Sequence, residues 1–171
     1  RATMKLERVI TMKIETQCLH AGYTPGNGEP LTLPIYQSTT YKYESTAQVA
    51  KLFDLTADGH MYSRISNPTV AAVEAKIAAL EGGVGALCTT SGQAASLISV
   101  LNILSCGDHI LCTSTIYGGT INLFAVTLKR FGIEVSFVDA DASEEELKKQ
   151  LRPNTKAVFA ETIANPAIAV L

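Results

Sequence analysis

The sequence predicts an α/β protein with a mainly parallel sheet and helices on both of its faces. From residue 66 onward, short apolar segments typical of buried strands alternate with segments of helical periodicity. Of the 171 residues, 47% are hydrophobic, which is enough for a buried core. Residues 1–60 lack this alternation, so we expect an extended N-terminal arm there and the sheet-forming domain over residues 61–171.

The expected helices begin and end at recognisable residues. In the arm, Ser45 can cap a short helix that runs to Phe53. Asn67 and Pro68 are typical of a helix start, and Gly82 ends that helix. Further helices are expected over residues 92–104, 119–131 and 143–151, the last opened by a capping box of Ser143 and Glu146. Four short strands are expected over residues 85–89, 109–113, 133–138 and 156–161.

Composition and charge exclude several classes of function. A net charge of −2 and a pI near 5.9 give no basis for binding nucleic acid or a membrane surface. No apolar run reaches the roughly 18 residues of a membrane span. Residues 1–5 are not followed by a signal-type apolar segment, so we expect a soluble cytoplasmic protein. The four cysteines form no C-x-x-C pair and the histidines lie far apart, so we expect no metal site and reduced, mostly buried thiols.

Three polar stretches follow the expected strands. Ser91-Gly92-Gln93 follows the first strand, Tyr117 the second, and residues 161–165 the fourth. In an open parallel sheet, ligands bind beyond the carboxyl ends of the strands. Taken alone, each stretch is explained by a helix cap or a turn, and their combination is what predicts a site at this edge.

The residue types in these stretches suit a phosphorylated aromatic ligand. Free amides at a helix start bind anions, Gly92 lets the backbone come close to a phosphate, and Ser91 adds a hydroxyl. Tyr117, before the turn at Gly118-Gly119, can stack on a pyridine ring and present its hydroxyl to a substrate proton. Asn165 can donate to a phenolic oxygen, and Glu161 can brace neighbouring polar groups.

A fourth stretch, Tyr62-Ser63-Arg64, offers a phenol and a guanidinium two residues apart. In an extended segment the two side chains would share one face. A guanidinium can bind a phosphate through two hydrogen bonds, and the phenol can add another. A solvated surface pair is the alternative.

These residues stand in runs that resemble the Cys/Met-metabolism family of pyridoxal-phosphate (PLP) enzymes, whose fold is aspartate-aminotransferase-like (fold type I). The resemblance extends from about Glu15 to the last residue, and within the family the sequence most resembles O-acetylhomoserine sulfhydrylases. It implies the N-terminal part of the PLP-binding large domain. The supporting runs are residues 15–23, 34–39, 62–69, 80–83, 91–95 and 159–162.

The resemblance implies roles for the matched residues. The amides of Gly92 and Gln93 would bind the phosphate, and Tyr117 would stack on the ring as the catalytic residue in proton transfer. Tyr62 and Arg64 would reach the cofactor of the neighbouring subunit, so a dimer is the minimum active unit and a homotetramer, a dimer of dimers, is expected. The complete set of expected cofactor-binding residues is Tyr62, Arg64, Ser91, Gly92, Gln93, Tyr117, Glu161 and Asn165.

The function implied is a transferase reaction of methionine biosynthesis. PLP-dependent γ-replacement on O-acetylhomoserine with sulfide or a thiol would give homocysteine or methionine and acetate. Methionine γ-lyase and cystathionine γ-synthase or lyase, of the same family, remain open. A non-catalytic domain that binds a phosphate-bearing ligand or a partner subunit is the alternative from another class.

The lysine that this family needs is not evident in the chain. Family members hold PLP as a Schiff base to a lysine in a Ser-x-Thr-Lys setting and pair the ring nitrogen with an aspartate. Of the nine lysines, only Lys156 follows a threonine, and it begins an expected strand at the opposite edge. We expect Lys156 to be a surface residue and the chain to be an N-terminal fragment of a protein twice as long or longer. Alone, it should not bond PLP covalently.

Overall fold

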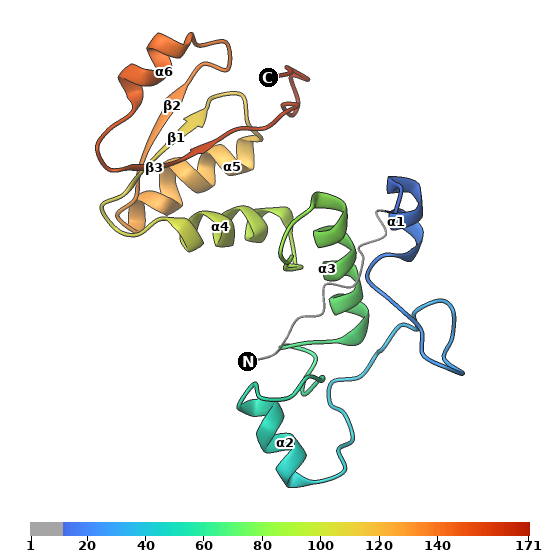
Figure 1. Ribbon diagram of the computed structural model, residues 1–171. Helices are drawn as coiled ribbons and strands as arrows, with labels where there is room; N and C mark the ends of the chain where they lie inside the picture. Colours follow the sequence, from blue (N-terminus) through green and yellow to red (C-terminus); the bar gives the residue numbers. More distant parts are fainter. Residues whose placement is uncertain (1–11) are drawn as a thin grey trace. The chain divides into compact units, whose positions relative to one another are not determined.

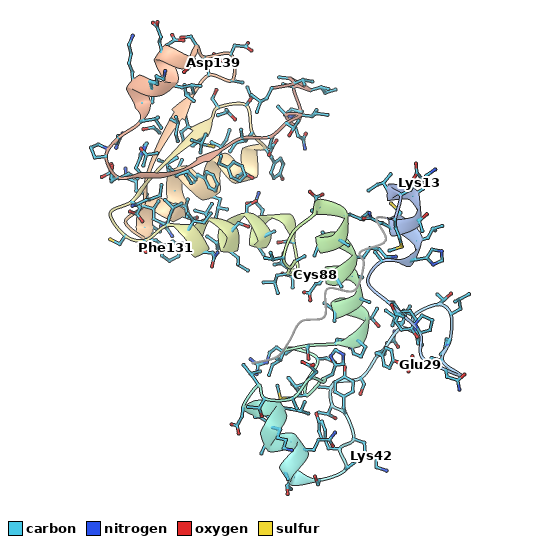
Figure 2. The ribbon with its side chains drawn as sticks, in the orientation of Figure 1. Lys13, Glu29, Lys42, Cys88, Phe131 and Asp139 are labelled. Atoms are coloured by element: carbon cyan, nitrogen blue, oxygen red, sulfur yellow. The ribbon has the colours of Figure 1, made fainter. Side chains whose placement is uncertain are left out.

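The computed structural model describes residues 12–171 (Figure 1). The chain forms two compact units, and the boundary between them lies after Cys88, which Figure 2 labels. The expected division into an arm over residues 1–60 and a domain over residues 61–171 stays a prediction. Residues 1–11 lie outside the described part of the chain, and so does the N-terminal segment for which no signal sequence was expected.

Three helices lie in the described part of the N-terminal unit, residues 12–88. They are α1 (Ile14–His20), α2 (Thr46–Phe53) and α3 (Pro68–Glu81). The expected caps of α2 and α3 are confirmed: Ser45 Oγ accepts from Gln48 N, and Asn67 accepts from Thr69 N through its side chain. Gly82 ends α3 with a φ of 64°, the left-handed conformation that glycine adopts at a helix end.

The segment before α2 is hydrogen-bonded along α3. Thr69 Oγ1 donates to Pro34 O at 3.0 Å, and Lys76 Nζ donates to Cys18 O at 3.0 Å. Gly22 approaches α3 so closely that a Cβ there would lie 2.1 Å from a backbone oxygen of the helix. Side-chain groups of α3 therefore fix the course of the irregular segment.

The C-terminal unit is a small α/β layer structure. Its parallel sheet has the order β2-β1-β3, and in Figure 1 α6 lies on one side of the sheet and α4 and α5 on the other. This confirms the expected fold class. The strands are β1 (His109–Thr113), β2 (Glu134–Val138) and β3 (Thr155–Phe159). The helices are α4 (Gly92–Ile103), α5 (Gly118–Asn122), the π-helical continuation η1 (Leu123–Leu128) and α6 (Glu144–Gln150), which begins with the expected capping box.

The strand expected over residues 85–89 is wrong. This segment has no strand partner among the described residues, and Leu87 is 70% exposed. The Cys88 amide donates instead to a carboxylate oxygen of Glu74 on α3, at 2.8 Å. A short apolar run becomes a strand only where a neighbouring strand takes up its backbone groups.

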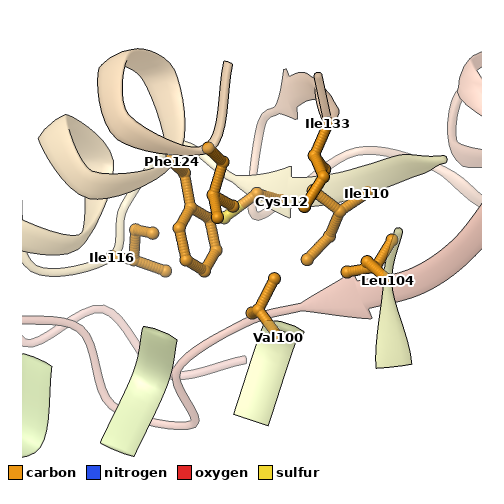
Figure 3. Packing of buried hydrophobic residues seen from close by; sticks show 8 residues of the cluster. Val100, Leu104, Ile110, Cys112, Ile116, Phe124 and Ile133 are labelled. Atoms are coloured by element: carbon orange, nitrogen blue, oxygen red, sulfur yellow. The ribbon is translucent and has the colours of Figure 1, made fainter. Parts of the chain in front are cut away.

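The core of the C-terminal unit lies between the sheet and its helices (Figure 3). Phe124 of η1 is fully buried and meets the Phe159 ring of β3 edge to face, with 4.9 Å between the ring centroids. The buried cluster consists of Val100, Leu104, Ile110, Cys112, Ile116, Phe124, Leu128 and Ile133. This packing fixes β1 and β3 against the helices that flank the candidate site.

The expectation of mostly buried thiols is wrong. All four cysteines are free, but Cys112 alone is buried, whereas Cys18, Cys88 and Cys106 are exposed. Cys18 lies on α1, which has no buried residue, and Cys88 lies in the segment that does not join the sheet. Burial, together with the negative charge of Glu161, raises the pKa of Cys112 to about 12, so this thiol is unreactive at neutral pH.

Residues 12–171 include no helix that is both long and apolar enough to cross a membrane. The same residues hold no cluster of three or more histidine, cysteine, aspartate or glutamate side chains arranged to bind a metal ion.

Candidate active site

One pocket of the C-terminal unit brings together residues from three segments. Its volume is about 370 Å³, and it lies where α4 and α5 begin and where β3 has just ended. The lining residues are Ser91, Gly92, Gln93, Ser96, Tyr117, Thr120 and Glu161. The pocket thus gathers five of the residues expected from the sequence: Ser91, Gly92, Gln93, Tyr117 and Glu161.

The parallel pairing of β1 with β3 explains why Tyr117 and Glu161 meet. Both residues follow the carboxyl ends of these neighbouring strands, which share one edge of the sheet. Tyr117 N donates to Glu161 Oε1 at 3.1 Å. Glu161 is half-buried, and its carboxylate therefore ties the turn before α5 to the end of β3.

The first turn of α4 offers free backbone donors. Ser91 caps the helix, and its Oγ accepts from Ala94 N at 3.1 Å. The amides of Gly92 and Gln93 have no acceptor among the described residues. A Cβ at Gly92 would meet nothing within 4 Å, so there is open room beside these amides. The Ser91 hydroxyl accepts a hydrogen bond and still has its proton to donate, so three donors are available for an anion.

Two residues of the pocket, Ser96 and Thr120, were not predicted from the sequence. Thr120 is 3% exposed and accepts from Gln93 Nε2 at 3.1 Å, which fixes the Gln93 side chain across the pocket. Ser96 lies three residues after Gln93 on α4, a spacing that places both on one helix face and could have indicated it. Nothing in the sequence pattern indicated Thr120, because its partner comes from another helix.

Tyr62 and Arg64 lie in the N-terminal unit and contact each other. The expected extended segment is wrong: Tyr62 O accepts from the amides of Ile65 and Ser66, at 2.8 and 2.9 Å, so the chain turns here. The turn places the Arg64 guanidinium carbon 5.6 Å from the centre of the Tyr62 ring. Both side chains are exposed, and the cation–π contact holds them as a pair.

Asn165 is exposed and does not belong to the pocket lining. It lies in the loop after β3, which is closed by an isolated bridge between Ile163 and Val170. Lys156 lies in the first half of β3 and is exposed, as expected for a surface lysine.

The charge of the pocket limits what it can bind unaided. Glu161 is the one charged residue among those that line it, and no lysine or arginine does so within the described part of the chain. Three hydrogen-bond donors at the α4 N-terminus suit a phosphate. A dianion beside a carboxylate, however, needs a cation from elsewhere. The donors of the lining therefore fit the phosphate end of PLP, and the lining itself lacks the positive charge that would balance a dianion.

Comparisons with known proteins agree on one family. Residues 15–171 match the family described as Cys/Met metabolism PLP-dependent enzyme. The chain is 46% identical to the O-acetyl-L-homoserine sulfhydrylase of Corynebacterium glutamicum, with 92% of this chain and 36% of the relative covered. It is also 46% identical to O-acetyl-L-homoserine sulfhydrylase 1 of Thermus thermophilus, with 93% and 38% covered. The chain thus spans little more than a third of the length of these curated relatives.

A solved structure supports the same relationship. It is that of a Campylobacter jejuni protein with the provisional name O-acetylhomoserine (thiol)-lyase, and it contains N'-pyridoxyl-lysine-5'-monophosphate. The TM-score is 0.84 and the identity 40%, with 93% of this chain and 39% of the other covered.

Proposed function

This chain belongs to the Cys/Met metabolism family of PLP-dependent enzymes, and we propose that the whole protein carries out γ-replacement on O-acetylhomoserine. Sulfide or a thiol takes the place of the acetate group and gives homocysteine or methionine, a step of methionine biosynthesis. The observation that carries the proposal is the pocket where the free amides of Gly92 and Gln93 face the same space as Tyr117. The names of the relatives indicate the substrate.

In this proposal the α4 N-terminus binds the phosphate of PLP. The amides of Gly92 and Gln93 and the Ser91 hydroxyl donate to the phosphate oxygens, and the positive end of the helix dipole adds to the attraction. When bound, PLP supplies an electron sink for the negative charge that forms at the substrate Cα. The helix holds the two backbone donors in place, and this restricts the orientation of the bound phosphate.

Tyr117 is proposed as the catalytic residue of this chain. Its ring covers the cofactor ring, and its hydroxyl holds a proton beside the substrate atoms that lose and regain protons. Glu161 holds the Tyr117 backbone through the bond at 3.1 Å. Asn165 is proposed to donate to the phenolic oxygen of the cofactor, from the loop that follows β3.

We also propose that Tyr62 and Arg64 complete the phosphate site of a neighbouring subunit. The pocket has no cation in its described lining, and the exposed Arg64 guanidinium supplies one. The proposed assembly is a homotetramer built from two such dimers, in the cytoplasm. Free cysteines without C-x-x-C pairs are consistent with a reducing compartment.

Mixed dimers test the shared site. Arg64→Ala and Tyr117→Ala variants, inactive alone, are co-expressed and the mixed protein is assayed. In a dimer of one subunit of each kind, one site carries both changes and the other carries neither, so random mixing restores about a quarter of the wild-type sites. No recovery of activity would contradict the sharing.

The activity is tested on the whole protein with PLP. O-acetylhomoserine and sulfide are supplied, and homocysteine and acetate are measured as products. Methionine alone serves as the comparison substrate. Homocysteine formation as the dominant activity supports the proposal, whereas ammonia and an oxoacid formed from methionine as the dominant activity would replace it with γ-elimination.

A further inference from the structure

Gly119, the second residue of α5, touches two side chains of the pocket. A Cβ at this position would lie 2.5 Å from Tyr117 Cε1, 3.2 Å from Tyr117 Cδ1 and 3.0 Å from Gln93 Nε2. The distance of 2.5 Å between this Cβ and Tyr117 Cε1 is much shorter than a van der Waals contact between two carbon atoms. A side chain at residue 119 would therefore displace the Tyr117 ring. The ring occupies the space that a side chain would need.

Backbone conformation does not explain a glycine at this position. Six other glycines of the described chain have a positive φ, and Gly119 is not among them, so an L side chain suits its backbone. The preceding Gly118 has no left-handed backbone either, and a Cβ on it would meet nothing within 4 Å. In backbone conformation the two glycines are alike, and they differ in the side chains that lie close to Gly119.

We propose that Gly119 is a positioning residue that holds the Tyr117 ring against the first turn of α5 and so sets where its hydroxyl lies in the pocket. The inference rests on the proposed function for the catalytic role of Tyr117. Gln93 is less free to yield than Tyr117, because its amide donates to the buried Thr120 hydroxyl. Tyr117 is 48% exposed, so a methyl group at residue 119 turns its ring toward solvent.

The test uses the whole protein and four variants: Gly119→Ala, Gly118→Ala, Tyr117→Ala and the double variant Tyr117→Ala/Gly119→Ala. The two glycine variants gain the same conformational restriction, so they are matched for backbone effects. PLP dissociation constants are measured by titration of the apoprotein, together with kcat, KM and the thermal midpoint. Binding of PLP is a readout that does not depend on turnover.

Gly119→Ala is expected to weaken PLP binding and to lower kcat, each by about tenfold, because a displacement of ~1 Å is enough for such losses. The KM for sulfide stays within about twofold, and Gly118→Ala behaves like wild type. In the Tyr117→Ala background, adding Gly119→Ala has little further effect, because the ring that the methyl group displaces is gone and only the 3.0 Å approach to Gln93 Nε2 remains.

Equal effects of the two glycine variants would overturn the inference, and so would a Gly119→Ala loss that persists without the Tyr117 ring. If Gly119→Ala alone does not fold, the double variant must fold, and its failure would also overturn the inference. Wild-type protein that binds PLP but makes no homocysteine would refute the proposed function, and the binding series would still decide the role of Gly119.

Discussion

Glu161 links β3 to the turn that presents Tyr117, so its removal should loosen Tyr117, the residue proposed to be catalytic. In Glu161→Ala, Tyr117 N loses its acceptor at 3.1 Å. Without this hydrogen bond the turn before α5 is less restrained, and the Tyr117 ring samples more positions. We expect a lower kcat/KM for the whole protein.

The size of the effect follows from the kind of bond and its exposure. A hydrogen bond to a charged group contributes about 1.5–3 kcal/mol when it is well shielded. Because Glu161 is half-buried and Tyr117 is 48% exposed, solvent screening reduces this figure to about 1 kcal/mol. Since 1.36 kcal/mol is a factor of ten in rate, kcat/KM should fall about fivefold.

Glu161→Gln is the matched control. Its side-chain carbonyl still accepts from Tyr117 N, so kcat/KM should stay within about twofold of wild type. Both variants remove the one negative charge of the pocket lining, so inorganic phosphate should bind the apoprotein more tightly in both. The assay is steady-state homocysteine formation, with phosphate binding measured by calorimetry. Equal losses of kcat/KM in the two variants would show that the hydrogen bond from Tyr117 N to residue 161 does not position Tyr117. Unchanged phosphate binding would show that the charge of Glu161 does not repel the phosphate.

Three further outcomes are expected. Phe124→Ala should lower the unfolding free energy by about 3–5 kcal/mol, because it leaves a cavity in the core. Phe131→Ala should lower it far less, because Phe131 is 49% exposed, and urea titration measures both variants. Burial, with the nearby Arg152, lowers the pKa of His109, so the folded state keeps it neutral while the unfolded chain binds a proton below about pH 6.5. Stability should therefore be complete above that pH and fall as the pH drops toward the lowered pKa, and His109→Gln should flatten this dependence. Cys112 should resist a thiol reagent at pH 8 until the protein is denatured, and rapid labelling of the native protein there would contradict its burial.

Features set by neighbouring residues were predictable from the sequence. Ser45, Asn67 and Ser143 cap their helices as expected, because a cap needs only a side chain and an amide two or three residues further on. The strands in the second half of the chain were also predictable, since each is a short apolar run between turn residues. The meeting of Tyr117 and Glu161 followed from the rule on strand ends, because β1 and β3 share one edge of the sheet. Ser91 lies in the same pocket, but the strand expected before it is absent from the described residues, so the rule does not explain its place.

Features that depend on distant partners were not predictable. Residues 85–89 have the composition of a strand, but the Cys88 amide bonds to Glu74 and no strand pairs with them among the described residues. Thr120 enters the pocket through Gln93 of another helix. The seven-residue α1 was missed because it has no buried face to impose a periodic pattern. For Cys88 and Thr120, the deciding contact joins residues far apart in the chain.

The central claim is that the N-terminus of α4 holds the phosphate of PLP beside Tyr117. The most direct test is a crystal structure of the whole protein with PLP bound. We expect phosphate oxygens within hydrogen-bond distance of the Gly92 and Gln93 amides and the Tyr117 ring stacked on the cofactor ring. A phosphate bound elsewhere, with these two amides still unbonded, would contradict it.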